Sequence, residues 1–522
     1  MRLSGQYNYG LLVTLQMSTT AGYKILAAFA VFLLAGYAVL DHWAPAGRRL
    51  AKIRGEDPVA YFGIAHSVLF DHDFNLTNEF EHVPPAGRLW TADQKETGLP
   101  GSPWGLGYSF LEVPLLGLGT AIDLLAGNPA DGFSEWAIYF YCYGTVLMAA
   151  LGLFALFTFL REVASFYGDP LEDRTVPYGL LATFAVFFGT NVGFYAFSQM
   201  SHSSTFLVAS LFLAFWWRVK LSEDARQWLI LGLLGGFLTI CRWQDLVYLA
   251  GPGLFDLFGW DLLKKGWPWW RSRLLFVAGV IICWIPQFME FKAIYGHYFT
   301  IPHGSGIFSF PPPHMLQVVL STESGWFTWT PLTLLGVVGL FIGSRKAPRV
   351  YLPWIAVIVL EVAVAGSVPF WSGLGSFSAR YLLSTTPLIG MGVVTFFCAA
   401  SVPMRRALLA ACLACCLYTG VFAIQFRLDL VPTGVPLTFT ELIVDKFRLP
   451  QVRQRKAALV EAREHFQKGD LDAAIRILQS TERFGEDRDV DAALGQAYRA
   501  AGKPELADAI EMRRMKFVGP GM

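Results

Sequence analysis

Residues 136–160 read WAIYFYCYGTVLMAALGLFALFTFL, a stretch without a single charged side chain. The hydrocarbon core of a bilayer is about 30 Å thick, and roughly 20 apolar residues in an α-helix are enough to cross it. A helix also satisfies all its backbone hydrogen bonds within one segment, as lipid requires. The stretch therefore predicts a transmembrane helix and places the chain among the all-α membrane proteins.

Further apolar segments of comparable length make the chain polytopic, with about eleven transmembrane helices expected in all. The other segments are 24–40, 178–197, 203–218, 227–241, 243–258, 274–292, 326–343, 350–368, 381–400 and 405–425. The composition agrees, because only 16% of the residues are charged, against about a quarter in average proteins. The net charge of +1 is not gathered into a basic domain, which argues against nucleic acid as a partner.

Basic residues cluster in the short loops between these segments, and such loops face the cytoplasm. They are Arg161 and Arg174, then Arg218, Lys220 and Arg226, then Lys264, Lys265, Arg271 and Arg273, then Arg345, Lys346 and Arg349, then Arg405 and Arg406. All these loops fall on one side only if the apolar stretch 104–126 does not cross the membrane. We therefore expect 104–126 to be a re-entrant or interfacial helix.

This topology divides the chain into four parts. Residues 1–23 form a cytoplasmic arm, and residues 24–426 form the transmembrane domain. Within that domain, residues 41–135 make a first external loop with interfacial helices. Residues 427–450 are a linker, and residues 451–522 form a small soluble helical domain on the outer side.

The helical domain is charged, and its pattern repeats. The segments EHFQKGDLDAAIRIL (464–478) and LGQAYRAAGKPELADAI (494–510) place Gly469 and Gly502 at equivalent helix–turn–helix corners. The spacing is close to the tetratricopeptide period of about 34 residues, so this tail resembles a tetratricopeptide pair. Two repeats are too few to be stable alone, and we expect the tail to dock on the membrane domain or on a partner protein.

The first external loop opens with GEDPVAYFGIAHSVLFDHDFNLTNE (55–79). Pro58 favours a helix start, where the backbone N–H groups stabilise the carboxylates of Glu56 and Asp57. The apolar face of this helix, which includes Tyr61, is expected to lie at the membrane surface. An acid held there can act as a general base. The alternative is that Asp57 only caps the helix.

The second half of this stretch is rich in acids. Asp71, Asp73 and Glu79 could bind a divalent cation, and oxygen ligands suit Mg²⁺ or Mn²⁺. The alternative is a solvated turn.

Charged and polar residues at the edges of spans are expensive and are functional candidates by default. Arg242, with Trp243 beside it, interrupts LTICRWQDLVY (238–248), and Arg380 begins a span in WSGLGSFSARYLL (371–383). His202 lies at a span mouth in FSQMSHSSTF (197–206). A guanidinium pairs bidentately with phosphoryl oxygens, so the two arginines could hold a phosphate. The alternatives are snorkelling of Arg380 to the interface and an ion pair between Arg242 and Asp245.

The order of these motifs resembles bacterial membrane proteins of the glycosyltransferase C superfamily, which includes protein mannosyltransferases and aminoarabinose transferases. The motifs are the acidic pair, DHDFNLTNE (71–79), GSPWGLGYSFLEVPLL (101–116), QMSHSSTF (199–206), LLGGFLTICRWQDLVY (233–248) and FWSGLGSFSARYLL (370–383). The resemblance covers roughly residues 20–425. It implies transfer of a sugar from a polyprenyl-phosphate carrier at the outer face of the bacterial inner membrane, with a cytoplasmic N-terminus and a periplasmic tail.

The resemblance also implies roles for individual residues. The catalytic acid of the first external loop matches Asp57, with Glu56 beside it, although related enzymes often carry the two acids in the opposite order. Arg380 matches the residue that holds the lipid phosphate, and Arg242 matches a charged mid-chain position. The remaining substrate contacts implied by position are His202, Gln199, Tyr61 and Trp243.

The implied reaction is a direct, inverting displacement in which a carboxylate deprotonates the acceptor hydroxyl and the arginines stabilise the departing phosphate. The acceptor is a lipid, a glycan or a protein. No phosphate-binding loop of the GxxxxGK[ST] type is present in the sequence. Two readings from other classes stay open: a transporter or flippase for lipid-linked sugars, and a non-catalytic scaffold that recruits a partner through its tail.

Overall fold

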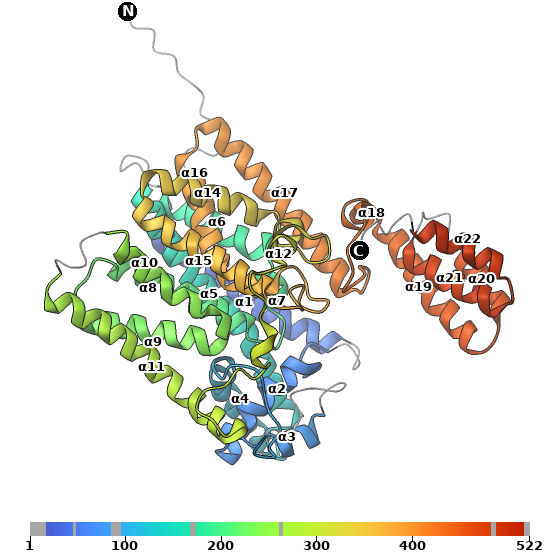
Figure 1. The fold of residues 1–522 in the computed structure, drawn as a ribbon, viewed down its shortest axis with the longest axis horizontal. Helices are drawn as coiled ribbons and strands as arrows, with labels where there is room; N and C mark the ends of the chain where they lie inside the picture. Colours follow the sequence, from blue (N-terminus) through green and yellow to red (C-terminus); the bar gives the residue numbers. More distant parts are fainter. Residues whose placement is uncertain are drawn as a thin grey trace, which may run out of the picture. The chain divides into compact units, whose positions relative to one another are not determined.

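The computed structural model describes residues 17–44, 49–84, 96–167, 174–259, 265–481 and 487–515, and within these ranges it contains helices and no strand. The chain forms two compact units, Met1–Thr419 and Gly420–Met522 (Figure 1). Of the arm predicted over residues 1–23, residues 1–16 lie outside the described residues. The first helix begins at Thr19, within the rest of the predicted arm.

Within the described residues, seven helical segments are long and apolar enough to cross a membrane. They are α1 (Thr19–Trp43), α4 (Gly107–Leu125), α5 (Glu135–Tyr167), α11 (Trp267–Tyr295), α15 (Pro348–Gly366), the segment Arg380–Ala399 made of η6 (Arg380–Thr385) and α16 (Thr386–Ala399), and α17 (Val402–Arg427). Two shorter apolar helices, α6 (Thr175–Gly189) and α9 (Ala225–Cys241), accompany them. The prediction of an all-α, multi-pass membrane protein is confirmed.

The difference from the expected eleven spans arises because several predicted spans are short or broken helices. These segments form α6 with α7 (Val192–Tyr195), α9, η3 (Trp243–Leu249) with α10 (Ala250–Leu257), and α13 (Trp326–Trp329) with α14 (Leu332–Lys346). A fifth predicted span forms α8 (His202–Val219), which is 18 residues long but begins with the polar run His202–Thr205 and is not among the seven. Two of the breaks can be located at single residues. Arg242 is extended at φ −149°, ψ 119°, and Pro331 separates α13 from α14 because it has no N–H to donate.

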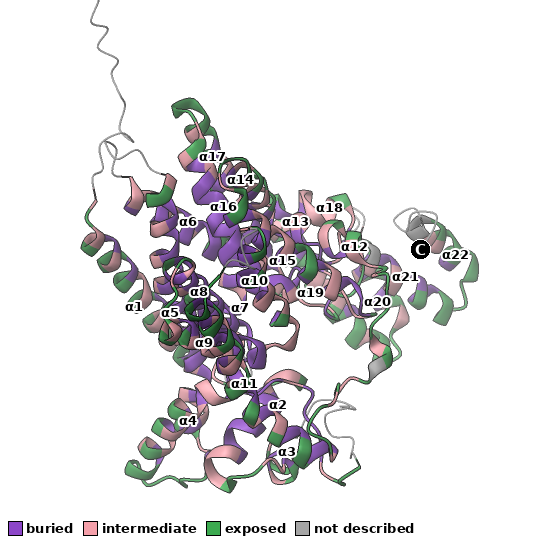
Figure 2. Cartoon of the chain, turned by 60° about the vertical axis from the view of Figure 1, so that its left-hand side comes forward, coloured by how far each residue is buried: buried purple, intermediate pink, exposed green. Residues whose placement is uncertain are grey.

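The segment 104–126, predicted to be re-entrant or interfacial, forms helix α4. It packs against α5 and against α2 (Glu56–His66), and it is itself long enough to span a membrane. Helices α2, α3 (Thr77–His82) and α4 gather at one end of the membrane unit in both ribbon views (Figures 1 and 2). Whether α4 crosses stays a prediction, because its length and composition fit both arrangements.

Burial separates inner from outer helices. Helices α5 and α16 are mostly buried, whereas α1 and α17 expose large apolar side chains such as Phe32 and Leu417 (Figure 2). This is the pattern expected of helices that face lipid. The inner helices approach closely through glycines: a Cβ added at Gly392 of α16 would lie 1.8 Å from the carbonyl oxygen of Gly336 in α14. Small residues of this kind bring membrane helices into contact.

Short helices complete the membrane unit: η2 (Ser67–Asp71), η5 (Ser305–Ile307) and α12 (Met315–Leu320). The second unit contains α18 (Phe439–Leu442), η7 (Val444–Phe447), α19 (Leu449–Gln467), α20 (Leu471–Ser480), α21 (Arg488–Ala500) and α22 (Pro504–Met515).

The helices of the tail form two hairpins. Gly469 and Gly502 have φ values of 79° and 71°, the left-handed conformation that ends a helix. The residues Ala474, Ala497 and Ala507 are buried in the shared core. The two corners therefore lie where the sequence predicts them.

Candidate active site

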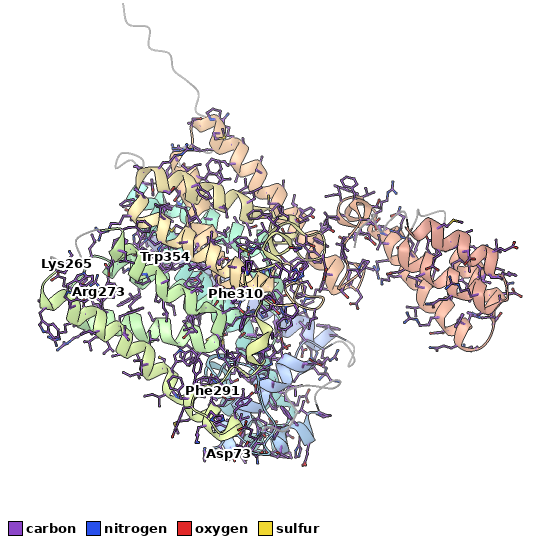
Figure 3. The ribbon with its side chains drawn as sticks, in the orientation of Figure 1. Asp73, Lys265, Arg273, Phe291, Phe310 and Trp354 are labelled. Carbon is purple, nitrogen blue, oxygen red and sulfur yellow. The ribbon has the colours of Figure 1, made fainter. Side chains whose placement is uncertain are left out.

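A cavity of about 470 Å³ lies in the first compact unit, Met1–Thr419, which is the membrane unit. Its wall draws on the start of α2, the 103–105 segment, the start of α8, the 241–247 segment, the loop after α11, the end of α15 and the start of η6. Helix α11 leads to it: in Figure 3, Lys265 and Arg273 lie at one end of this helix and Phe291, a cavity residue, lies toward the other.

Most of the wall is apolar. The apolar residues of the wall include Phe299, Ile301, Ile307, Phe308, Phe310, Val364, Val368 and Phe370. Several of these side chains are exposed, and Phe310 is 71% exposed. Such a surface suits a hydrocarbon chain better than a sugar. The charged residues of the wall, Asp57, Arg242 and Arg380, come from α2, the 241–247 segment and η6.

An ion pair joins two of these charged residues. Asp57 Oδ2 lies 3.2 Å from Arg380 Nη1, and the two side chains are 17% and 15% exposed. Asp57 belongs to the first turn of α2, and Arg380 begins η6. Because both groups are largely shielded from water, their attraction is stronger than that of a surface pair. The pair therefore fixes the N-terminus of α2 against a segment 323 residues away.

Arg242 supports this arrangement from the 241–247 segment. Its Nη1 donates a hydrogen bond of 3.0 Å to the carbonyl oxygen of Arg380, and Gln244 donates one of 2.5 Å to the carbonyl oxygen of Tyr381. The carboxylate oxygens of Asp245 are buried without a hydrogen-bond partner. Arg242 is thus tied to the η6 backbone, and the ion pair with Asp245 that the sequence left open is not formed.

Three other predicted residues line the same cavity: Tyr61, His202 and Trp243. The Tyr61 hydroxyl donates to Ser201 Oγ at 3.0 Å. The buried His202 ring stacks on Tyr195 with centroids 4.0 Å apart, and its two nitrogens have no hydrogen-bond partner. His202 therefore offers unused polar atoms at the cavity wall.

Two predicted residues are outside the cavity wall. Glu56 is exposed, and its pKa is raised by desolvation and by the neighbouring Asp57. Gln199 is buried and donates to the carbonyl oxygen of Leu50 at 3.2 Å. Glu56 points away from the cavity because adjacent residues of an α-helix point in directions about 100° apart, and its neighbour Asp57 faces the cavity. Of the two acids, Asp57 is the one at the cavity.

Sequence reasoning missed other residues of the wall, including Trp104 and His303. Their rings lie edge to face with centroids 5.8 Å apart. Burial lowers the pKa of His303 to about 4, so this imidazole is neutral at physiological pH. Trp104 belongs to the motif 101–116, where an aromatic residue among glycines was the available signal.

The three acids of the predicted metal site do not all lie together. The ligand atoms of Asp71 and Glu79 cluster with that of His66, all within 4.8 Å of one another. Asp73 does not join them, because its carboxylate accepts hydrogen bonds from Ser67 Oγ at 2.8 Å and from the N–H of Asn75 at 2.9 Å. The cause is the wide π-helical turn η2, which ends at Asp71 and leaves Asp73 in the following turn.

The His66–Glu79 contact is buried, with Nδ1 and Oε1 2.9 Å apart. Burial works to lower the pKa of His66, but its hydrogen bonds to Glu79 and to the carbonyl of Asp131 outweigh this and raise the pKa. Burial raises the pKa of Glu79. Both shifts favour the protonated form of the group, so the short contact holds a proton between Nδ1 and Oε1.

Comparison with known proteins finds a distant structural likeness. No family model and no curated protein matches the sequence. Among solved structures, the archaeal oligosaccharyltransferase AglB from Archaeoglobus fulgidus, in complex with an inhibitory peptide and a dolichol-phosphate, is similar over 85% of this chain, with 13% sequence identity and a TM-score of 0.42. The match spans 58% of the AglB chain. At this distance the likeness assigns neither a substrate nor an activity.

Proposed function

We propose that this chain is a membrane glycosyltransferase that moves a sugar from a polyprenyl-phosphate donor to an acceptor at the outer face of the bacterial inner membrane. One observation carries the proposal: the carboxylate of Asp57 and the guanidinium of Arg380 meet 3.2 Å apart on the wall of a largely apolar cavity. A base, a phosphate-binding cation and a hydrocarbon surface are the three parts that this reaction requires.

The ion pair suggests how donor binding prepares the base. The donor's phosphodiester carries one negative charge, as a carboxylate does, and pairs bidentately with a guanidinium, so it competes with Asp57 for Arg380. Once released, the Asp57 carboxylate can accept the proton of an acceptor hydroxyl. The hydroxyl oxygen then bonds to the anomeric carbon while the bond to the phosphate oxygen breaks, which inverts the anomeric configuration.

The leaving polyprenyl phosphate gains negative charge as that bond breaks. Arg380 and Arg242 both line the cavity, and a fixed positive charge beside the phosphate stabilises the transition state. The apolar wall that includes Phe308 and Phe310 is suited to the polyprenyl chain. His202, Tyr61 and Trp243 are the candidates for contact with the sugar or the acceptor.

The proposed orientation follows the basic loops. The loop before α11 carries Lys265, and the loop after it carries His303 of the cavity. A span between them puts the cavity on the side opposite the basic loops, which is the outer face if those loops face the cytoplasm. The tail then lies in the periplasm, where it could present an acceptor or a partner protein.

A sugar-transfer assay tests this function. It uses a panel of radiolabelled polyprenyl-phosphate sugars and membranes that contain the wild-type chain. Label that reaches a lipid, glycan or protein acceptor supports a transferase. Label that changes leaflet but stays on its carrier would instead show a flippase. If neither occurs with any donor, and cells need the tail but not Asp57, the chain is a scaffold.

A further inference from the structure

We propose that His66, Asp71 and Glu79 bind one divalent transition-metal cation, Zn²⁺ or Mn²⁺, and that the ion fastens the first external loop at a site separate from the Asp57–Arg380 cavity. The three side chains come from the end of α2, from η2 and from α3. Their ligand atoms lie within 4.8 Å of one another. Ligands about 2.1 Å from a shared ion lie about 3–4 Å apart, so a small closure completes the site.

The hydrogen bond on the far side of His66 sets its tautomer. Nε2 lies 2.8 Å from the carbonyl oxygen of Asp131, which can only accept, so Nε2 carries a hydrogen. In the neutral ring, Nδ1 then presents a lone pair toward Glu79 Oε1 at 2.9 Å. Two lone pairs at this distance repel unless a proton or a cation lies between them. A backbone carbonyl that holds the outer nitrogen is also the usual support of a metal-binding histidine.

Glu79 gives a second, independent observation. Its side chain is 1% exposed, and its Oε2 atom has no hydrogen-bond partner. A buried carboxylate oxygen left unsatisfied is costly, and a cation removes that cost. Asn78 holds the acids in place, because its Nδ2 donates to Asp71 Oδ2 at 3.0 Å and to Glu79 Oε1 at 3.3 Å.

The location argues for a positioning role. His66 follows Asp57 by nine residues on α2, which corresponds to about 13 Å along a helix axis. None of the three proposed ligands lines the cavity. An ion here would join α2 to α3 and to the Asp131 segment, and would hold the helix that carries Asp57 without touching the transferred sugar.

The ligand set selects the ion. An imidazole with two carboxylates suits Zn²⁺ or Mn²⁺, whereas Mg²⁺ prefers oxygen ligands and retains its waters. Asp71 is exposed, so water can complete the coordination sphere. With His66 in place of Asp73 in the ligand set, Zn²⁺ replaces Mg²⁺ among the expected ions, and Mn²⁺ stays.

Metal content of the purified full-length protein tests the proposal. The chain is stripped with chelator, dialysed against Zn²⁺ or Mn²⁺ with excess Mg²⁺ present, and assayed by mass spectrometry and by titration calorimetry. We expect one ion per chain for the wild type. Glu79→Gln and Asp71→Asn should weaken binding by more than the roughly 10- to 100-fold that follows loss of an outer-shell partner. Glu81→Gln and Asp73→Asn are matched controls that should bind as the wild type does.

Unfolding temperature gives a readout that does not depend on activity. Chelator should lower it for the wild type and both controls, and should leave Asp71→Asn unchanged, because a bound ion stabilises only the folded chain. Asp71 is exposed, so this variant is expected to fold even if Glu79→Gln does not. Absence of stoichiometric metal, or equal binding by Asp71→Asn, would overturn the proposal and leave His66 and Glu79 as a buried proton-sharing pair.

Discussion

Asp57 Oδ2 and Arg380 Nη1 are 3.2 Å apart in space and belong to residues 323 positions apart in the chain. The pair joins the first turn of α2 to the start of η6. Neither group is fully buried, so both can exchange this partner for a ligand.

Arg380→Ala should reduce sugar transfer by about 10²- to 10³-fold, the loss typical when a group that stabilises developing negative charge is removed. Arg380→Lys should recover only part of this, because an ammonium keeps the charge but not the bidentate geometry. The measurement is the initial rate of label transfer in membranes. Lys292→Ala, an exposed cation near the end of α11, is the control and should transfer normally. Full activity of Arg380→Ala would remove this residue from phosphate binding.

The proposed topology predicts opposite labelling of two exposed positions. Tyr298→Cys in the loop after α11 should react with a membrane-impermeant thiol reagent added to spheroplasts, whereas Leu221→Cys in the loop after α8 should react only after permeabilisation. Both native side chains are well exposed, at 64% and 74%. The reverse pattern would place the cavity on the cytoplasmic face and contradict an outward-facing enzyme.

Gly392→Ala should destabilise the packing of α14 on α16. The added methyl group would lie 1.8 Å from the carbonyl oxygen of Gly336, so the helices must separate. Overpacking of this kind costs about 1–3 kcal/mol. Thermal unfolding in detergent measures the effect. Gly36→Ala in α1 is the matched control, because nothing lies within 4 Å of its added methyl group; equal stability of the two variants would show that the interface yields.

The tail unit should become more stable as the pH rises from about 7 to about 10. Burial lowers the pKa of Lys446 to about 7, against the opposing effect of Asp445, while an unfolded lysine titrates near 10.4. Between these values the unfolded chain binds more protons than the folded chain, so stability rises with pH, and below pH 7 the effect is constant. Hydrogen-exchange protection factors of η7 and α19 in the full-length protein measure this.

Lys446→Met should abolish the rise in protection, because no charge is then buried. Lys468→Met, which alters an exposed lysine at the end of α19, should leave it intact. A pH dependence that persists in Lys446→Met would assign it to another group.

The sequence predicted the helical membrane class because an apolar run of about 20 residues satisfies its backbone hydrogen bonds in lipid as a helix. It also singled out Arg242 and Arg380, because charge at the edge of a span is rare enough to stand out, and Asp57, because an acid begins the helix at Glu56–Asp57. All three line the cavity. The tail corners were readable for a similar reason: Gly469 and Gly502 adopt the left-handed conformation that glycine favours.

Other features depend on geometry that a linear pattern does not carry. The π-helical turn at Ser67–Asp71 brings His66 rather than Asp73 to the acid cluster. The breaks at Arg242 and Pro331 shorten spans that look continuous by hydropathy. Gln199 was expected at the site, but its side chain turns to a backbone carbonyl. His303 was missed because a loop residue reaches the cavity only through tertiary folding.

The most direct test of the central claim is transfer of labelled sugar from a polyprenyl-phosphate donor by the wild type, by Asp57→Asn and by Glu56→Gln. Removal of a general base typically costs 10²- to 10⁴-fold, so Asp57→Asn should lose activity by about that factor. Glu56→Gln changes the adjacent, exposed acid and should stay within a few-fold of the wild type. Loss of transfer in Glu56→Gln together with normal transfer in Asp57→Asn would contradict the assignment of Asp57 as the base.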